Sequence, residues 1–322
     1  MASYLHFVLN LIITLSLFFI IPFTTAAPLN LKQAPYKKAV RTGTITDPNI
    51  LEASGIAAST GRQSTLWVIN DGGNPAVLYA LAPTGKRLNS FLIVSPSGME
   101  VKNTDWEDLS AFEYNGEHFL LIADLGDNKA KRNFCTLLVI KEPDPESHQK
   151  KLPIECKIQF KYADGPNDCE AVAVDVPKQR ILLLSKRKPE PILYELPLIV
   201  SPGRDMYTAH QIGIIKNIPE PTPSDLKDKY GAFRSQPTAM DLSSDGRTMV
   251  ILTYKHGYIY NRQSGQTWQD AFTAMPLLLE LPHPNTGELV QREALCLDQK
   301  TGAIIVTSEK ANAPIYVLNP MK

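Results

Sequence analysis

Short apolar runs, rich in β-branched residues and bounded by polar turns, recur along most of the chain. Five of them stand at corresponding places: residues 66–69, 120–123, 181–184, 249–252 and 303–306. Each follows a shorter segment that begins with polar residues, and each is followed by a polar loop and another apolar run. Runs of this length and composition, punctuated by Gly, Asn and Asp, predict β-strands rather than helices.

The segments that open these sets can be placed under one another as five copies of one repeat. They are residues 52–57, 105–110, 168–173, 236–241 and 291–296. A fourth strand fits at the end of the first four repeats, and residues 41–45 could supply the missing strand of the last one. The repeats therefore predict an all-β fold, a five-bladed β-propeller closed by its N-terminal strand. A six-bladed ring is the alternative, and it would need another blade within residues 197–234.

The N-terminal segment has the pattern of a leader peptide. Residues 8–21 are almost entirely apolar, and small side chains follow up to Ala26. An apolar run of this length is shorter than the roughly 20 residues that cross a bilayer. We expect a signal peptide over residues 1–26, an extension over 27–37 and a single propeller domain over 38–322. We therefore expect a secreted or periplasmic protein with no stable membrane insertion after cleavage. The alternative is that the segment stays on the protein as an uncleaved membrane anchor.

Charge and composition narrow the class of partner. The chain has 33 Lys and Arg against 33 Asp and Glu, a formal net charge of +0, whereas nucleic-acid binding favours a basic excess. Hydrophobic residues make up 43% and charged residues 20%, as in folded globular proteins. We expect no nucleic acid, and instead a small polar ligand or a protein partner. We expect a monomer.

Four cysteines in an exported chain raise the question of disulfides. Cys135 and Cys156 lie in apolar runs that could be neighbouring antiparallel strands. We predict a disulfide between them, with free thiols as the alternative. Cys169 and Cys296 have the surroundings of small buried side chains, and their spacing from histidines gives no zinc pattern.

Acidic residues recur where the first strand of each repeat begins. In an antiparallel pair this edge is also where the second strand ends, so both sets of polar residues should meet at one mouth of the propeller axis. Lysines follow the second strands in three repeats, at Lys186, Lys255 and Lys310. The carboxylates expected at this mouth are Glu52, Asp105, Glu107, Asp168, Glu170 and Glu293.

Carboxylate and carbonyl oxygens converging on one point suit a hard cation, and calcium is the cofactor we expect. The predicted metal ligands are Asp105, Glu107, Asp168 and Glu170. The predicted residues for a small polar ligand are Asn70, Asp71, Asp124, Lys186, Tyr254, Glu293 and Glu309. A calcium-dependent hydrolase of phosphoesters, lactones or glycans is the alternative function, with Glu107 and Glu170 as catalytic residues. These groups could also serve only to close the channel by capping backbone groups or pairing with lysines.

Two stretches resemble a known family. Residues 168–196 and 292–318 are similar to the bacterial propellers called SdiA-regulated, and residues 105–109 with 126–128 resemble a related group of uncharacterised secreted bacterial propellers. The resemblance implies a secreted or membrane-associated ring of short blades and specifies no activity. A more distant resemblance to gluconolactonase-type propellers would imply a central divalent metal. Ser54 and Thr238 stand where the other three repeats have Glu, so a five-fold carboxylate site is interrupted in two repeats.

Overall fold

The computed structural model describes residues 31–201, 203, 206–282 and 289–321, and its regular structure is almost entirely β. Repeat 1 consists of β2 (Ala53–Ala58), β3 (Leu66–Asn70), β4 (Val77–Leu81) and β5 (Arg87–Val94). Repeat 2 consists of β6 (Trp106–Tyr114), β7 (Glu117–Asp124), β8 (Cys135–Lys141) and β10 (Cys156–Tyr162). Repeat 3 consists of β11 (Cys169–Asp175), β12 (Arg180–Ser185), β13 (Ile192–Pro197) and β14 (Tyr207–Ile214).

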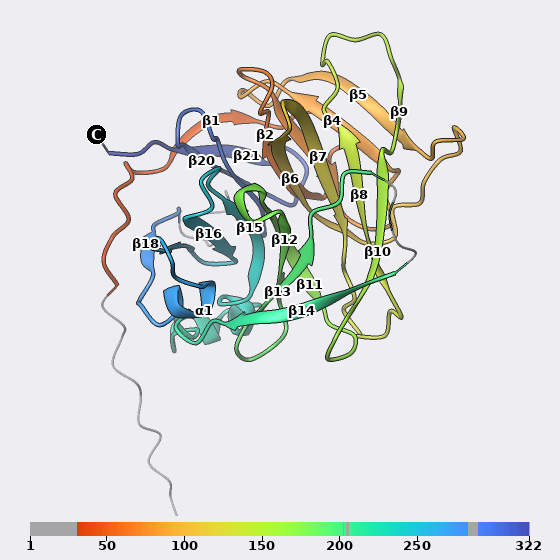
Figure 1. The fold of residues 1–322 in the computed structure, drawn as a ribbon. Helices are drawn as coiled ribbons and strands as arrows, with labels where there is room; N and C mark the ends of the chain where they lie inside the picture. Colours follow the sequence, from red (N-terminus) through yellow and green to blue (C-terminus); the bar gives the residue numbers. More distant parts are fainter. Residues whose placement is uncertain (1–30, 202, 204–205, 283–288, 322) are drawn as a thin grey trace, which may run out of the picture. The chain divides into compact units, whose positions relative to one another are not determined.

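The last two repeats have the same organisation. Repeat 4 consists of β15 (Pro237–Leu242), β16 (Thr248–Thr253), β17 (Gly257–Asn261) and β18 (Leu277–Leu279), with the short helix α1 (Trp268–Ala271) before its outer strand. Repeat 5 consists of β19 (Arg292–Leu297), β20 (Ile304–Ser308), β21 (Pro314–Leu318) and β1 (Val40–Thr44). Strand β1 pairs antiparallel with β21, so the N-terminal strand completes the C-terminal sheet, as predicted (Figure 1).

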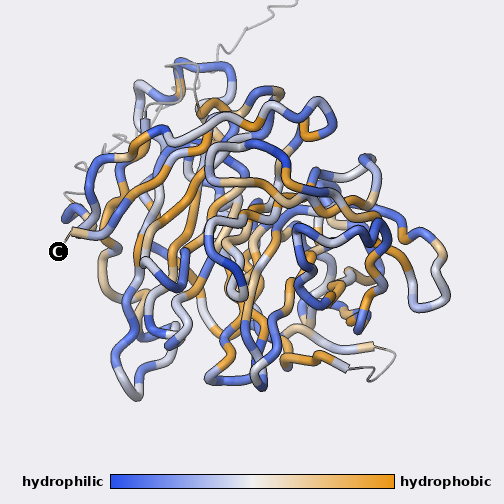
Figure 2. The backbone as a smooth tube through the Cα atoms, turned by 90° about the horizontal axis from the view of Figure 1, so that it is seen from above, coloured by the Kyte–Doolittle hydropathy of each residue, from blue (hydrophilic) through white to orange (hydrophobic). Residues whose placement is uncertain are grey.

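The first strands of the repeats contact one another in a closed order. Strand β2 contacts β6, β6 contacts β11, β11 contacts β15, β15 contacts β19, and β19 contacts β2 again. The described chain is therefore an all-β, propeller-like fold with these five strands innermost. Figure 2 shows the hydrophobic stretches gathered in the strands and the hydrophilic ones at the turns between them.

Five hydrophobic clusters fill the spaces between consecutive repeats. Trp67 of repeat 1 and Trp106 of repeat 2, for example, belong to one cluster and are both fully buried. All five residues of β3 are buried, because neighbouring sheets cover both of its faces. Burial on both faces explains why the strands appear in the sequence as continuous apolar runs instead of alternating ones.

Two parallel pairings were not predicted. Strand β9 (Lys151–Pro153) adds to the outer edge of β5, and β10 pairs in parallel with β14. The second pairing joins repeats 2 and 3 into one eight-stranded sheet. Within the described part of residues 197–234, β14 is the main strand, followed by 3-10 turns at Asp225–Lys227 and Gly231–Phe233, so this part of the chain offers no further four-stranded sheet.

The predicted disulfide is wrong. Cys135 and Cys156 do lie on neighbouring antiparallel strands, but Cys135 is opposite Phe160 and Cys156 is opposite Val139. A register difference of four residues corresponds to about 13 Å along a strand, whereas a disulfide requires Cα atoms within about 7 Å. All four cysteines are buried free thiols.

The N-terminal boundary of the folded unit also differs from the prediction. The compact unit begins at Leu31, and the described residues of the expected extension, 31–37, pair with segments of repeats 4 and 5. Gln33 forms a parallel bridge with Leu278, and Ala34 is buried. The expected leader, residues 1–26, lies outside the described residues. Among the residues that the structure describes, no helix has the length and apolar character needed to cross a membrane.

Candidate site at the channel mouth

The inner strand of every repeat carries a β-bulge at the same place. The pairing of each inner strand with the next strand skips one residue, and the five skipped residues are Ser54, Glu107, Glu170, Thr238 and Glu293. A bulge leaves its extra residue unpaired and redirects the side chain, which is why bulges occur beside active sites. Each of them is the third residue of its repeat segment in the sequence. The sequence repeat therefore reflects a repeated backbone bulge, which directs five side chains to one region.

Three carboxylates meet beside the bulge of repeat 2. Oxygens of Asp71, Asp105 and Glu107 all lie within 4.8 Å of one another, and we call these residues the carboxylate triad. Asp71 follows β3, Asp105 precedes β6, and Glu107 is the bulge residue of β6. The triad thus joins repeats 1 and 2, and no basic side chain in the described part of the chain forms an ion pair with any of its members.

Two glycines allow the backbone to approach the triad closely. A Cβ atom on Gly126 would collide with the carboxylates of Glu107 and Asp105, and one on Gly72 would collide with Asp105. The backbone N–H of Gly126 donates to the Asp105 carbonyl at 3.2 Å. The glycines of the two polar loops after β3 and β7 therefore make room for the carboxylates, beyond serving as turn residues.

A chain of hydrogen bonds crosses the mouth from repeat 3 to repeat 5. The Lys186 Nζ group forms a close ion pair with Glu170 and donates to the Tyr254 hydroxyl at 2.9 Å. The Tyr254 hydroxyl in turn donates to Glu293 Oε1 at 2.7 Å. Lys186, Glu170 and Glu293 are all buried, so this chain fixes its members in place.

Burial and mutual repulsion govern the electrostatics of these groups. Burial, followed by the neighbouring Asp71 carboxylate, raises the pKa of Asp105 to about 6. Burial and then the charge of Glu170 raise the pKa of Glu107 well above its usual range. Burial would lower the pKa of Lys186, but the carboxylates of Glu170 and Glu293 raise it, so this lysine stays charged. One lysine cannot neutralise so many acids, and the mouth therefore favours protons or a bound cation.

The other predicted residues have structural partners. Asp124 forms an ion pair with Arg132 at 2.8 Å, and Asp168 forms one with Arg187 at 2.5 Å. Asn70 uses its side-chain amide to donate to the carbonyl of residue 49 and to accept from the N–H of residue 52. Of the four predicted metal ligands, Asp168 and Glu170 thus have basic partners, whereas Asp105 and Glu107 form no ion pair among the described residues. Asp71, predicted to bind a polar ligand, lies with Asp105 and Glu107.

Two glutamates lie at the edge of the mouth. Glu309 accepts a hydrogen bond from Gln291 at 2.8 Å, and burial together with the charges of Glu293 and Asp71 raises its pKa to about 7. Glu52 accepts from the Asn74 side chain at 2.7 Å. Both groups add negative charge to the region around the triad.

The pKa of Asp105 predicts a pH-dependent cost to folding when no cation is present. The pKa of Asp105 is higher in the folded state than in the unfolded state. The protonated carboxyl group therefore contributes to the stability of the fold below about pH 4, and this contribution is lost as the pH rises through about 6. In chelator, Asp105→Asn should gain roughly 1–2 kcal/mol of stability relative to wild type between pH 4 and pH 7, because the carboxyl group is only partly buried and solvent screens its charge. Urea unfolding at several pH values measures this difference, and a difference independent of pH would contradict the assignment. Glu117→Gln, a change on the exposed surface, is the control.

The comparisons with known proteins give alignments of low sequence identity. No family model and no curated protein sequence matches the chain. A PQQ-bound aldose sugar dehydrogenase from Streptomyces coelicolor aligns with a TM-score of 0.46 and 10% identity, over 91% of this chain and 99% of that one. A protein from Bacteroides uniformis, provisionally described as a 6-phosphogluconolactonase, aligns with a TM-score of 0.38 and 11% identity, over 83% and 71% of the two chains. At these values neither likeness supports a functional assignment.

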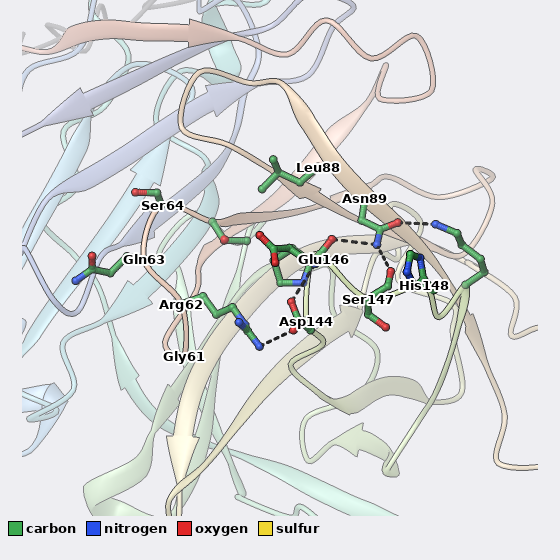
Figure 3. A pocket seen from close by; sticks show the side chains of 13 residues that line it. Gly61, Arg62, Gln63, Ser64, Leu88, Asn89, Asp144, Glu146, Ser147 and His148 are labelled. Carbon is green, nitrogen blue, oxygen red and sulfur yellow. Dashed lines mark hydrogen bonds and ion pairs between the residues drawn. The ribbon is translucent and has the colours of Figure 1, made fainter.

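A large polar hollow lies elsewhere, between repeat 1 and the segment that joins β8 to β9. It has a volume of about 690 Å³ and is lined by residues 61–65 together with residues 144–148 and their neighbours (Figure 3). Arg62 and Asp144 form an ion pair across it at 2.9 Å. None of the residues predicted from the sequence as ligand, metal or catalytic groups lines this hollow, so it is not the predicted site.

Proposed function

We propose that this protein is a five-bladed β-propeller that binds a divalent cation, calcium, at the carboxylate triad and a small polar ligand beside it. Support for five blades comes from the five four-stranded repeats, the closed order of contacts between their inner strands, and the five hydrophobic clusters. The observation that carries the cation is the approach of three carboxylates to within 4.8 Å without a basic partner among the described residues.

The geometry of the triad suits calcium better than magnesium. Oxygens bound to calcium at 2.3–2.6 Å can lie up to about 5 Å apart, whereas magnesium holds its ligands at 2.0–2.1 Å and demands a closer octahedron. Asp71, Asp105 and Glu107 would hold the ion. Three carboxylates fall short of the six to eight oxygens that calcium takes, so a ligand and water would supply the rest.

The remaining residues of the mouth would bind the polar ligand. Lys186 and Tyr254 present an ammonium and a hydroxyl that Glu170 and Glu293 hold in place. A ligand oxygen bridging the cation and Tyr254 would contact three repeats at once. This fixed arrangement requires little reorganisation on binding, which favours affinity for a small rigid ligand.

A calcium-dependent hydrolase is the second candidate function. Its support is Glu107, which is buried with a raised pKa next to Glu170, a combination typical of catalytic carboxylates. With Glu170 held by Lys186, Glu107 is the better placed general base, and in this candidate Asp71 and Asp105 would hold the ion without it. Retained turnover in Glu107→Gln, in a screen of phosphoester, lactone and glycan substrates, would remove this candidate.

Export and family membership belong to the same proposal. We infer a secreted or periplasmic protein from the predicted leader over residues 1–26, and we retain the SdiA-regulated-like propellers as its proposed family. The support for both lies in the sequence patterns described above.

Thermal melting tests the cation site. Calcium at about 100 times its Kd should stabilise wild type by about 2.7 kcal/mol, or roughly 4–5 °C for a domain of this size. Asp105→Asn and Glu107→Gln should melt at the same temperature in calcium and in chelator. Glu117→Gln, on the surface of β7, should respond like wild type. An unchanged melting temperature of wild type in saturating calcium would remove the metal from both candidate functions.

A further inference from the structure

A second pocket, of about 450 Å³, lies on repeat 2 next to the carboxylate triad, and residues 101–104, which precede β6, form one side of it. Its floor contains Leu138 and Ile154, which are buried members of the hydrophobic cluster between repeats 1 and 2. Val101 packs against the same cluster, and Phe134 lines the rim with 42% of its surface exposed. One part of the pocket is therefore apolar enough to bury a hydrocarbon group.

The rest of the pocket is basic. Lys102, Arg132 and Lys157 line it, and Asp124 is the one acid among the described lining residues. Arg132 Nη1 neutralises Asp124 at 2.8 Å and donates to the Gly126 carbonyl at 3.0 Å. These contacts leave Nε and Nη2 of Arg132 without a described acceptor. Neither lysine forms an ion pair within the described chain, so the pocket has a net positive charge while the adjoining mouth is negative.

We propose that this pocket binds an organic phosphate, a phosphate monoester of an apolar alcohol. The two lysines and Arg132 offer enough positive charge for a dianion, and lysine ammonium groups bind phosphate as point charges. The apolar part of the ester would cover Leu138 and Ile154, where each buried CH₂ group contributes about 0.8 kcal/mol. A purely inorganic anion would leave this floor uncovered.

The pocket is a neighbour of the cation site but does not depend on it. Thr104 and Asp124, which line the pocket, are joined by a hydrogen bond from the Thr104 N–H to Asp124 Oδ2 at 3.4 Å. Thr104 directly precedes Asp105 of the triad. The organic phosphate would therefore lie beside the cation, while its own contacts come from other residues. Titrations in chelator test the pocket alone, so failure here and failure of the calcium proposal can be distinguished.

Phenyl phosphate is the probe, titrated into the full protein in the presence of chelator. Binding should weaken at least tenfold in Lys157→Glu and in Lys102→Glu. Lys161→Glu is the matched control, because Lys161 is also exposed on β10, four residues from Lys157, and does not line the pocket. Its affinity should stay within twofold of wild type. An equal loss in all three variants would show a general effect of net charge and would overturn the site.

Three further measurements test the class of ligand. Inorganic phosphate should bind at least tenfold more weakly than phenyl phosphate, and Phe134→Ala should weaken phenyl phosphate about threefold. Benzoate, with a single negative charge, should also bind at least tenfold more weakly. Equal affinity for inorganic phosphate would overturn the apolar subsite, and equal affinity for benzoate would overturn the preference for phosphate. Circular dichroism of each variant confirms that the fold is retained.

Discussion

Lys186→Met should reduce the free energy of unfolding by about 3–5 kcal/mol, because it leaves buried carboxylates without their cation. Lys186 forms an ion pair with Glu170 and donates a hydrogen bond to the Tyr254 hydroxyl. Its positive charge also stabilises the charged form of Glu293 and thereby lowers the pKa of that group. Urea denaturation measures the loss. It should be larger at pH 8 than at pH 5, because a carboxyl group with a raised folded-state pKa loses its stabilising contribution as the pH rises.

A second substitution separates charge from packing. In the double variant Lys186→Met with Glu170→Gln, one unpaired carboxylate is replaced by a neutral amide, so more than half of the loss should be recovered. Lys188→Met, two residues along the chain and exposed, is the matched control and should change stability by less than about 0.5 kcal/mol. A Lys186→Met protein as stable as wild type at pH 8 would show that the positive charge of Lys186 does not stabilise the carboxylates around it.

Asp108→Ala should also destabilise the protein strongly, by about 3 kcal/mol or more, because it removes the acceptor for several buried N–H groups. Asp108 is fully buried in β6 and accepts hydrogen bonds from the backbone of residues 109, 172 and 240 at 2.8, 2.8 and 3.4 Å. These partners belong to repeats 2, 3 and 4. One carboxylate thus ties three inner strands together near the axis.

A surface control and a conservative variant show whether the loss comes from the hydrogen bonds of Asp108. Glu113→Ala, on the exposed end of the same strand, should cost less than about 0.5 kcal/mol. Asp108→Asn keeps one acceptor oxygen but turns an N–H₂ group toward a backbone donor, so it should recover only part of the loss. A fully stable Asp108→Ala would mean that the three backbone groups find other acceptors and that this carboxylate does not hold the inner strands together.

The repeat could be identified in the sequence because sheets covered on both faces appear as continuous apolar runs. The third position of each repeat, from Ser54 to Glu293, was visible for the same reason: it stands 10–13 residues before the start of one of those runs. What it does in the backbone was not visible. A bulge changes the alternation of a strand by one residue, and a strand that is buried on both faces has no alternation to interrupt.

The prediction of a disulfide was wrong because the register of two paired strands depends on the connection between them. Residues 142–155 separate β8 from β10 and contain β9, which pairs with repeat 1 instead of extending a hairpin. A long connection of this kind does not fix the register, so neighbouring strands could be anticipated but the positions of Cys135 and Cys156 along them could not.

The basic side chains that pair with acidic residues at the channel mouth could not be predicted from the sequence either. Arg132 and Arg187 neutralise Asp124 and Asp168 through contacts that depend on where long, flexible side chains come to rest. Asp71 was expected among the ligand-binding residues, and the structure places it with Asp105 and Glu107. A hint was present in the glycines of the loops after β3 and β7, since Gly72 and Gly126 mark close approaches of the backbone to a carboxylate.

Calcium titration calorimetry on the purified protein tests the central idea most directly, that backbone bulges and loop glycines bring Asp71, Asp105 and Glu107 close enough to share one ion. Wild type should take up one calcium ion per chain, and Asp105→Asn should bind at least a hundredfold more weakly. Heat of binding absent from wild type, or unchanged in Asp105→Asn, would contradict the account.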